Sequence, residues 1–179
     1  MLIPTHGGYR QLKSFQTATI IYDLTLIFIG KYIPKASRTN DQMHQAARSG
    51  KQNIAEGSMA SGTSKKTEIK LIGVARASLE ELLLDYEDYL REHQLELWGK
   101  EDSRVKTIRA LSYMTNKSDK TYKTYLSSPE PAANCLICLI HQANYLLDQQ
   151  LRTLEKELLE KGGFTENLYQ KRIEFRKKQ

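Results

Sequence analysis

Residues 42–90 read QMHQAARSGKQNIAEGSMASGTSKKTEIKLIGVARASLEELLLDYEDYL and contain two helical patterns in succession. Its first half repeats small or apolar residues at steps of four, three and four: Met43, Ala47, Gly50 and Ile54. Its second half carries a seven-residue pattern at Ile69, Ile72, Arg76, Leu79, Leu83, Tyr86 and Leu90. Both spacings place side chains on one face of an α-helix. Because a short loop rich in Gly and Ser separates the halves, the stretch predicts a helical hairpin.

Residues near the hairpin predict where its helices begin and end. Thr39 followed by Gln42 has the form of a capping box at the start of the first helix, and Gly57 is expected to end it. Ser64 is the expected N-cap of the second helix. Small residues would let the two backbones approach closely if the turn is centred near residue 60: Ala46, Ala47, Gly50, Gly73, Ala75 and Ala77.

A further long helix is predicted before the hairpin, over about residues 9–33, with Pro34 ending it. Its seven-residue seam consists of Leu12, Phe15, Thr19, Tyr22, Leu26 and Ile29. Five more apolar residues lie off the seam: Ile20, Ile21, Leu24, Ile27 and Phe28. A helix that is apolar nearly all round is buried on more than one side. We expect its second face to lie in an oligomer interface or beneath the C-terminal extension.

Another long helix is predicted over residues 129–161. Ser128 is the expected N-cap, Pro129 suits the first helical position, and Gly162 terminates the helix. Its seam consists of Ala133, Ile137, Ile140, Asn144, Leu147, Leu151, Leu154 and Leu158. Asn144, a polar residue on this seam, is expected to specify register or oligomeric state. Shorter helices are expected over residues 101–113 and after Thr165.

The sequence therefore predicts an all-α protein with an antiparallel, up-down-up-down four-helix bundle in residues 1–161. The bundle helices are expected at about 9–33, 40–57, 64–93 and 129–161, with an insertion over 99–128 and a basic C-terminal suffix segment over 162–179.

Two motifs, NIAEG at residues 53–57 and ARASLEEL at residues 75–82, resemble a family of small bacterial four-helix-bundle proteins. That family is related to proteins encoded by intervening sequences of ribosomal RNA genes and to the accessory variability proteins of diversity-generating retroelements. The ending GGFTENLYQKR, residues 162–172, looks like the extra segment of the four-helix-bundle suffix subgroup. The resemblance implies a homopentamer that binds nucleic acid and a reverse transcriptase.

Charge is unevenly distributed along this chain of 179 residues with a formal net charge of +6. Residues 80–102 hold nine acidic and two basic residues, whereas residues 104–123 hold six basic residues and one acidic residue. A basic surface concentrates polyanions. No stretch has the ~18 to 20 uncharged apolar residues of a membrane span, and residues 1–10 lack the pattern of a signal peptide. We expect a cytoplasmic protein without a membrane partner.

The basic and aromatic residues of the insertion and suffix are the candidate nucleic-acid-binding set, since lysine attracts phosphate and tyrosine stacks on unpaired bases. The set comprises Arg104, Lys106, Arg109, Lys117, Lys120, Tyr122, Lys123, Tyr125, Lys171, Arg172, Arg176, Lys177 and Lys178. The alternative for any one of them is an ordinary solvated surface. Ser64, Lys65 and Lys66 are secondary candidates for phosphate contact at a helix N-terminus; Asn53 and Glu56 beside them are expected to tie the hairpin together.

Arg76 interrupts an apolar seam and therefore needs a carboxylate partner. Folding the first helix back over the second places Asp23 near the level of Arg76, so we expect an ion pair between these two residues. Glu80, one turn further along the same helix, is the alternative partner. We interpret the pair as structural.

Cys135, Cys138 and His141 are spaced at three-residue steps, which drift around a helix and do not form a closed metal site. We therefore expect no metal and no cofactor. The sequence carries no nucleotide-binding loop, nucleophile elbow or metallohydrolase signature, so we expect no enzymatic activity.

The functional prediction is a non-catalytic, oligomeric nucleic-acid-binding or scaffold protein that contacts RNA or DNA backbones. A homopentamer is the first assembly to test, and a reverse transcriptase or other ribonucleoprotein component is a possible protein partner. The alternative is a protein–protein interaction module with no nucleic-acid ligand, which would use the acidic belt of residues 80–102 and the second face of the first helix.

Overall fold

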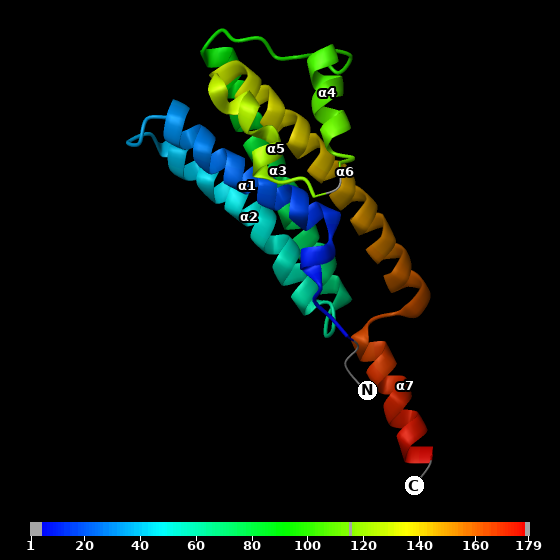
Figure 1. The fold of residues 1–179 in the computed structure, drawn as a ribbon. Coiled ribbons are helices and arrows are strands. Elements are labelled where there is room, and N and C mark those ends of the chain that lie inside the picture. The colour runs from blue at the N-terminus through cyan, green and yellow to red at the C-terminus, as the bar shows by residue number, and fades with distance from the viewer. Residues whose placement is uncertain (1–4, 115, 178–179) are drawn as a thin grey trace.

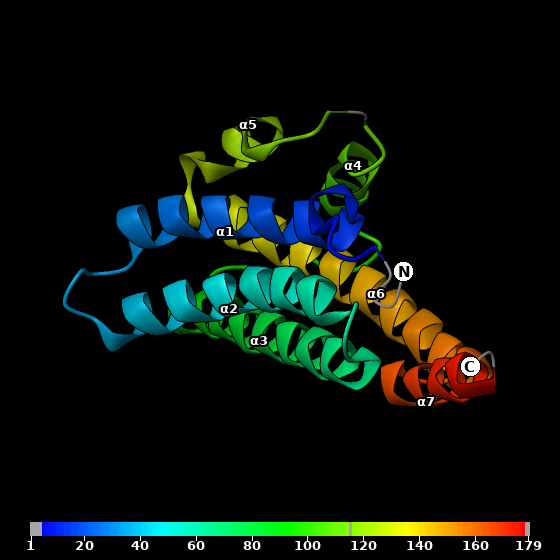
Figure 2. The same ribbon diagram turned by 90° about the horizontal axis from the view of Figure 1, so that it is seen from below.

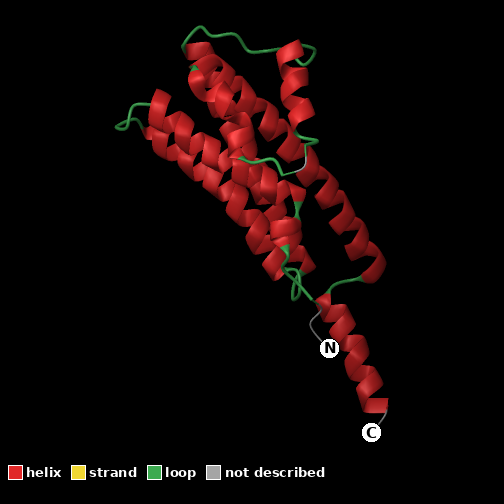
Figure 3. Cartoon of the chain, viewed as in Figure 1, coloured by secondary structure: helices red, strands yellow, loops and turns green. Residues whose placement is uncertain are grey.

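The computed structural model describes residues 5–114 and 116–177, and within these ranges the chain is all-α with no β-strand (Figure 3). The elements in chain order are η1 (Tyr9–Gln11), α1 (Lys13–Tyr32), α2 (Arg38–Ala60), α3 (Lys65–Glu92), α4 (Ser103–Leu111), α5 (Asp119–Tyr122), η2 (Lys123–Ser127), α6 (Pro129–Lys161) and α7 (Phe164–Lys177). Within the same ranges, none of the helices combines the length and the apolar character that crossing a bilayer requires.

Four long helices, α1, α2, α3 and α6, enclose the core (Figure 1). Helix α2 packs against α1 and α3, and α6 packs against the same two helices from the other side. At the centre, the ring of Phe28 meets that of Tyr86 edge to face, with 4.9 Å between ring centroids. Both side chains are fully buried, and the Tyr86 hydroxyl donates a hydrogen bond of 2.9 Å to Thr25 Oγ1. The polar atom of this large aromatic residue is therefore satisfied inside an apolar core.

The hairpin of α2 and α3 confirms the predicted close approach at Gly50. A Cβ atom built there would lie 2.6 Å from Leu79 Cδ2, so only glycine fits without a shift of its neighbours. The prediction that Gly57 ends α2 is wrong; the helix continues to Ala60, and Gly57 packs against the backbone of Glu68. By contrast, a Cβ atom at Gly73 would meet no other group within 4 Å, so Gly73 takes no part in the close packing.

The helix ends partly differ from those predicted. Ser64 caps α3 as expected, accepting a hydrogen bond from Thr67 N at 3.1 Å. The N-cap of α2 is Ser37 and not Thr39, because the Ser37 hydroxyl accepts from Thr39 N at 3.2 Å and starts the helix earlier. Gly162 ends α6 as predicted, with a φ of 68° that favours glycine.

The predicted seam of α1 is largely wrong. Ile29 is its only buried member among the helical positions, while Leu26 is 39% exposed. The core face instead contains residues that the prediction placed off the seam: Ile20, Ile21, Leu24 and Phe28. Because apolar residues occur all round this helix, spacing alone could not select the face that points to the core.

The second face of α1 is covered by the insertion and not by the C-terminal segment. Tyr122 and Leu126 are buried, and the Leu126 carbonyl accepts hydrogen bonds from Lys31 Nζ at 3.0 Å and from Tyr32 Oη at 2.9 Å. Helix α7 extends away from the four long helices (Figure 1). Figure 2 shows α4 and α5 on one side of α1 and α6.

Replacing Gly50 by alanine is expected to lower the free energy of unfolding by about 1–3 kcal/mol, because the new methyl group overlaps the Leu79 side chain. Gly73→Ala is the matched control in the same hairpin: it meets open space and should raise stability by roughly 0.5–1 kcal/mol through helix propensity. Urea denaturation followed by circular dichroism measures both. Equal effects of the two substitutions would contradict the close approach.

Candidate functional site

The position of the insertion depends on Asn134, which is buried in α6. Its Oδ1 accepts from Trp98 N at 2.8 Å, and its Nδ2 donates to the Glu96 carbonyl at 2.8 Å. The indole Nε1 of Trp98 donates to Glu130 at 3.1 Å, and the Arg104 guanidinium lies over the indole ring, 4.1 Å from its centroid. These contacts attach the segment after α3 to α6 and so fix where α4 begins.

Helices α1, α4 and α6, together with the connection from α4 to α5, enclose a cleft of about 1140 Å³. Its charged and aromatic lining residues are Arg10, Lys13, Phe15, Asp23, Arg109, Tyr113, Lys117, Asp119, His141 and Tyr145. The lining thus combines cations with aromatic side chains.

The cationic part of the cleft brings together segments that are far apart in the sequence. Lys117 Nζ donates to the Ser112 carbonyl at 2.6 Å, which holds the ammonium at the cleft wall. Partial burial, followed by the nearby positive charge of Lys13, lowers the pKa of Lys117. Arg109 donates from Nη1 to the Lys100 carbonyl at 3.3 Å. Two ammonium groups that repel each other within one cleft favour an anionic ligand between them.

Two carboxylates also line the cleft. Burial, and secondarily the negative charge of Asp119, raises the pKa of Asp23, while Lys51 opposes this effect. Asp119 is paired with Lys123 at 3.1 Å, and the hydrogen bond from Lys123 lowers its pKa. The acidic groups would repel a phosphate, so an anion is expected to follow the side of the cleft that carries Lys13 and Lys117.

Large side chains with high exposure stand at the cleft. Tyr113 is 88% exposed, Met114 54% and Tyr145 64%. Exposed aromatic rings offer a face on which a planar ligand can stack. Cleft cations and aromatic faces together suit a ligand with phosphates and bases.

The structure brings only part of the predicted binding set to this cleft. Arg109 and Lys117 line it. Arg104 instead pairs with Asp102 at 2.7 Å and Glu96 at 2.9 Å, and Lys106 pairs with Glu101 at 3.0 Å. These cations have intramolecular partners, which reduces the charge that they offer to a phosphate.

Tyr122 cannot stack on a base as predicted, because its side chain is fully buried. Burial raises its pKa to about 12. Tyr125 is half-buried, and Lys120 is exposed. The sequence around these tyrosines is rich in hydroxyl groups and lysine and has no apolar periodicity, so it could not show which tyrosine packs on the core.

The basic residues of the suffix lie on α7, away from the cleft (Figure 1). Lys171, Arg172, Arg176 and Lys177 are all exposed. Lys178 lies outside the described residues. The predicted binding set is therefore divided between two separate surfaces.

The secondary phosphate candidates already have other partners in two of three cases. Ser64 accepts the capping hydrogen bond from Thr67 N. Lys65 pairs with Glu68 at 2.9 Å and with Glu157 at 3.5 Å, whereas Lys66 is exposed. Ser64 and Lys65 are thus engaged in contacts within the protein, which leaves Lys66 as the exposed candidate for phosphate contact.

The predicted ion pair between Asp23 and Arg76 is wrong. Arg76 Nε donates to Asp148 Oδ1 at 2.5 Å, and Glu80, the alternative partner, lies 3.8 Å from Arg76 Nη1. Asp148 is on α6, which packs beside α3, while Asp23 lies on the face of α1 that lines the cleft. The prediction matched Asp23 and Arg76 by their levels along the helices, but α1 and α3 each pack against α2 and α6 and lie on opposite sides of the core.

Of the remaining polar candidates, Asn144 and Asn53 make structural contacts, whereas Glu56 has no hydrogen bond or ion pair among the described residues that would tie the hairpin together as predicted. Asn144 Nδ2 donates to Glu80 Oε2 at 3.0 Å and so links α6 to α3. Asn53 Nδ2 donates to Ser49, whose hydroxyl is 2.8 Å from that of Ser78 across the hairpin. Glu56 is exposed.

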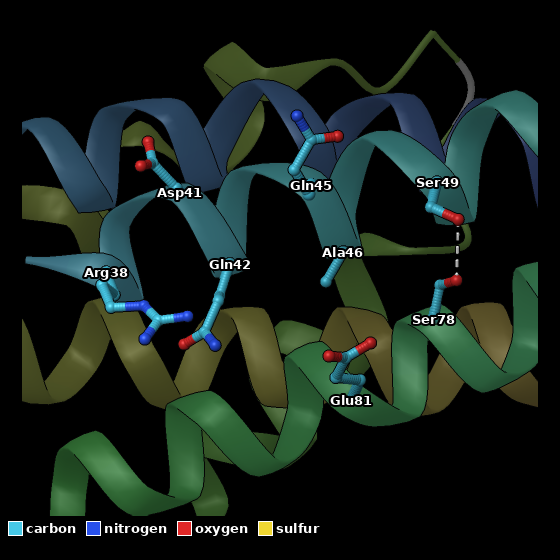
Figure 4. A pocket seen from close by; sticks show the side chains of 8 residues that line it. All are labelled: Arg38, Asp41, Gln42, Gln45, Ala46, Ser49, Ser78 and Glu81. Carbon is cyan, nitrogen blue, oxygen red and sulfur yellow. Dashed lines mark hydrogen bonds between the residues drawn. The ribbon is translucent and has the colours of Figure 1, made fainter.

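A second, shallower hollow of about 470 Å³ lies between α2 and α3 (Figure 4). It is lined by Arg38, Asp41, Gln42, Gln45, Ala46, Ser49, Ser78 and Glu81. In Figure 4 the Ser49–Ser78 hydrogen bond closes one end, and Glu81 points from α3 toward α2. Its charges are mixed and no aromatic side chain lines it, so it is a weaker candidate for nucleic acid than the cleft.

Cys135 and Cys138 are buried free thiols, and Cys138 lies at the cleft wall. Burial raises the pKa of Cys138 to about 11 and raises that of Cys135 further. Thiolate, the form that binds metal, is therefore scarce at both positions. In the described part of the chain, no three Cys, His, Asp or Glu residues come together in a way that could hold a metal ion.

Sequence reasoning missed most of the cleft lining, including Arg10, Lys13, Tyr113, His141 and Tyr145. A weak signal existed. Arg10 and Lys13 are three residues apart, and His141 and Tyr145 are four apart, so each pair can share a helix face. Their proximity to Lys117 depends on the path of the insertion, which periodicity does not give.

Comparisons with protein-family models, with curated proteins and with solved structures gave no match. The resemblance carried by NIAEG and ARASLEEL therefore stays a prediction.

The acidic stretch of α3 predicts a pH dependence of stability. Burial, then the charges of Glu81 and Asp88, raises the pKa of Asp85 to about 6. The folded state keeps this proton at a pH where the unfolded chain, with a pKa of about 3.9, has lost it. The resulting stabilisation is complete below pH ~4 and is lost as the pH rises through about 6.

Asp85→Asn should remove this loss and raise the free energy of unfolding at pH 7 by the order of 1 kcal/mol, since solvent screening reduces the effect. Denaturation at several pH values and low protein concentration measures it. Glu56→Gln, which removes an exposed carboxylate, is the control and should retain the wild-type profile. An unchanged profile in Asp85→Asn would exclude this origin of the pH dependence.

Proposed function

We propose that the chain is a non-catalytic nucleic-acid-binding protein, built as an up-down-up-down four-helix bundle, whose cleft binds single-stranded RNA or DNA. The observation that carries the proposal is the convergence of Arg10, Lys13, Arg109 and Lys117 beside exposed Tyr113 and Tyr145 in one open cleft. Phosphates would lie along the cations, and bases would stack on the tyrosines.

The arrangement favours single strands over duplex. Unpaired bases expose their faces to aromatic side chains, whereas bases in a duplex are stacked on one another. Binding through phosphate and stacking carries little sequence preference.

Association with other chains completes the proposal. The family resemblance supports a homopentamer as the first assembly to test, and an accessory role beside a reverse transcriptase or in another ribonucleoprotein. A cytoplasmic location agrees with such a role.

Neutralising the two cleft lysines tests the ligand class. Lys13→Gln with Lys117→Gln should weaken binding of mixed-sequence single-stranded RNA by about tenfold or more and lower the salt slope of log K by about one per lysine. Fluorescence anisotropy at several salt concentrations measures both quantities. The control is Lys35→Gln with Lys100→Gln, two exposed lysines outside the cleft, which should retain wild-type affinity.

Removal of the exposed rings tests the mode of binding. Tyr113→Ala and Tyr145→Ala should each cost about 1–3 kcal/mol of binding free energy with single-stranded RNA, because a base loses its stacking surface. Binding of an abasic phosphodiester strand should not change. Tyr169→Ala, which removes an exposed ring from α7, is the control. Equal losses with the two ligands would contradict stacking.

A protein–protein interaction module is the second candidate, and one observation favours it. Helix α7 has no buried residue, and two of its large aromatic side chains are open to a partner: Tyr169 is 63% exposed and Phe175 is 64% exposed. Protein binding that is insensitive to salt, with no measurable affinity for nucleic acid, would support this candidate over the first.

A further inference from the structure

Helix α7 lacks the packing that a helix of its length needs. It has 14 residues and no buried side chain. Isolated helices shorter than about 12–15 residues are marginal in water even with favourable sequences. A stable α7 therefore requires a surface to pack on, and the described part of the chain buries none of its side chains in the extended position that α7 takes (Figure 1).

The side of α7 that can pack carries both apolar side chains and cations. Phe164, Leu168 and Phe175 follow at steps of four and seven, so they lie along one face of the helix. Lys171 lies on the same face, three residues after Leu168 and four before Phe175. The exposed Arg172 and Arg176 lie next to this face. A complementary surface would carry exposed apolar residues at helical spacing with carboxylates beside them.

Helix α3 presents such a surface, which we call the α3 ridge: Val74, Ala77, Glu81, Leu84 and Asp88. These five residues are exposed and follow at alternating steps of three and four. Val74 is 46% exposed and Leu84 54%, so the apolar members are not covered by α2 or α6. Steps of three and four on an exposed face are the spacing by which one helix packs along another.

Charge on the ridge matches charge on α7. Residues 80–88 contain five carboxylates and no cation. Asp88 has a partner in Arg91 at 2.8 Å, but Asp85 Oδ2 is buried with no hydrogen-bond partner among the described residues. Arg172 and Arg176 of α7 carry the charge opposite to that of these carboxylates.

The α3 ridge and helix α7 also agree in length. The ridge spans the 14 residue steps from position 74 to position 88, about 21 Å at 1.5 Å per residue, and the 14 residues of α7 cover the same distance. We propose that α7 of one copy packs along the α3 ridge of a second copy of this chain, with Arg172 and Arg176 facing Glu81, Asp85 and Asp88.

The same chain's α7 could reach only the first part of this surface, Val74 and Ala77, and not Leu84 or Asp88. Lys65 at the start of α3 pairs with Glu157 near the end of α6, so α7 begins beyond the start of α3. A helix that turned back at Gly162 would end about 14 residues along α3, near residue 79, before Leu84. A contact between two different surfaces of identical chains closes into a ring when the rotation permits, which deepens the oligomeric part of the proposed function.

Sedimentation velocity of the full chain tests the contact through paired charge reversals. The arm variant is Arg172→Glu with Arg176→Glu, and the ridge variant is Glu81→Lys with Asp88→Lys. Wild-type protein should associate, and each variant alone should raise the dissociation constant by about tenfold or more. An equimolar mixture should recover association, because reversed arms then meet reversed ridges.

Lys35→Glu with Lys100→Glu is the control, since it reverses two exposed cations elsewhere and should associate as wild type does. Circular dichroism confirms that each variant is folded. A wild-type monomer over the whole concentration range, association that survives both reversals, or a mixture that gains nothing would overturn the proposal.

A cross-link provides a readout independent of charge. Leu84→Cys and Phe175→Cys, on separate chains mixed under oxidised glutathione, should yield a disulfide-linked heterodimer, while the buried native thiols Cys135 and Cys138 stay reduced. Absence of the heterodimer in an associated sample would also overturn the contact. The ridge substitutions change neither the cleft nor any candidate nucleic-acid-binding residue, so nucleic-acid binding by the ridge variant separates failure of this contact from failure of the proposed ligand.

Discussion

The side chain of Asn134 is buried, so its NH₂ group and its carbonyl oxygen both need hydrogen-bond partners. Both find them on the backbone of the segment that follows α3, at Glu96 and Trp98. An unpaired polar group at this depth would cost about 1–3 kcal/mol, so the segment has little freedom to move. Trp98 consequently packs against α6, and Arg104 lies on its ring. The insertion then returns across α1 and ends with Leu126, whose carbonyl accepts from Lys31 and Tyr32. One wall of the cleft therefore depends on a side chain outside it.

The charges of the chain show why a segregated sequence does not give a segregated surface. The acidic residues that follow α3 lie beside the basic residues of the insertion and pair with them, as Glu96 and Asp102 do with Arg104. Lys123 is paired in the same way with Asp119. The cations that remain for a ligand in the cleft are Arg10, Lys13, Arg109 and Lys117. Two of these four come from η1 and the start of α1.

Local rules predicted much of the fold. Ser64, Gly50 and Gly162 act as their chemistry requires, because a cap or a close approach depends on neighbours within the chain. The face of α1 could not be predicted, since apolar residues surround that helix. The closer partner of Arg76, Asp148, was missed because spacing along the chain does not show that α6 packs beside α3, whereas the alternative partner Glu80 lies within 3.8 Å. The cleft itself follows from the path of the insertion, which Tyr122 and Leu126 determine by packing, and a pattern of spacings carries no information about that path.

Cys138 and Cys135 occupy successive depths in α6, one at the wall of the cleft and the other in the core. Burial shields both side chains and raises the pKa of both thiols while the helices stay packed. A thiol-specific label would thus react first with Cys138 when the insertion lifts from α6, and with Cys135 only when the core opens. The labelling rates of the two native cysteines would therefore distinguish local opening of the insertion from global unfolding, without an introduced cysteine.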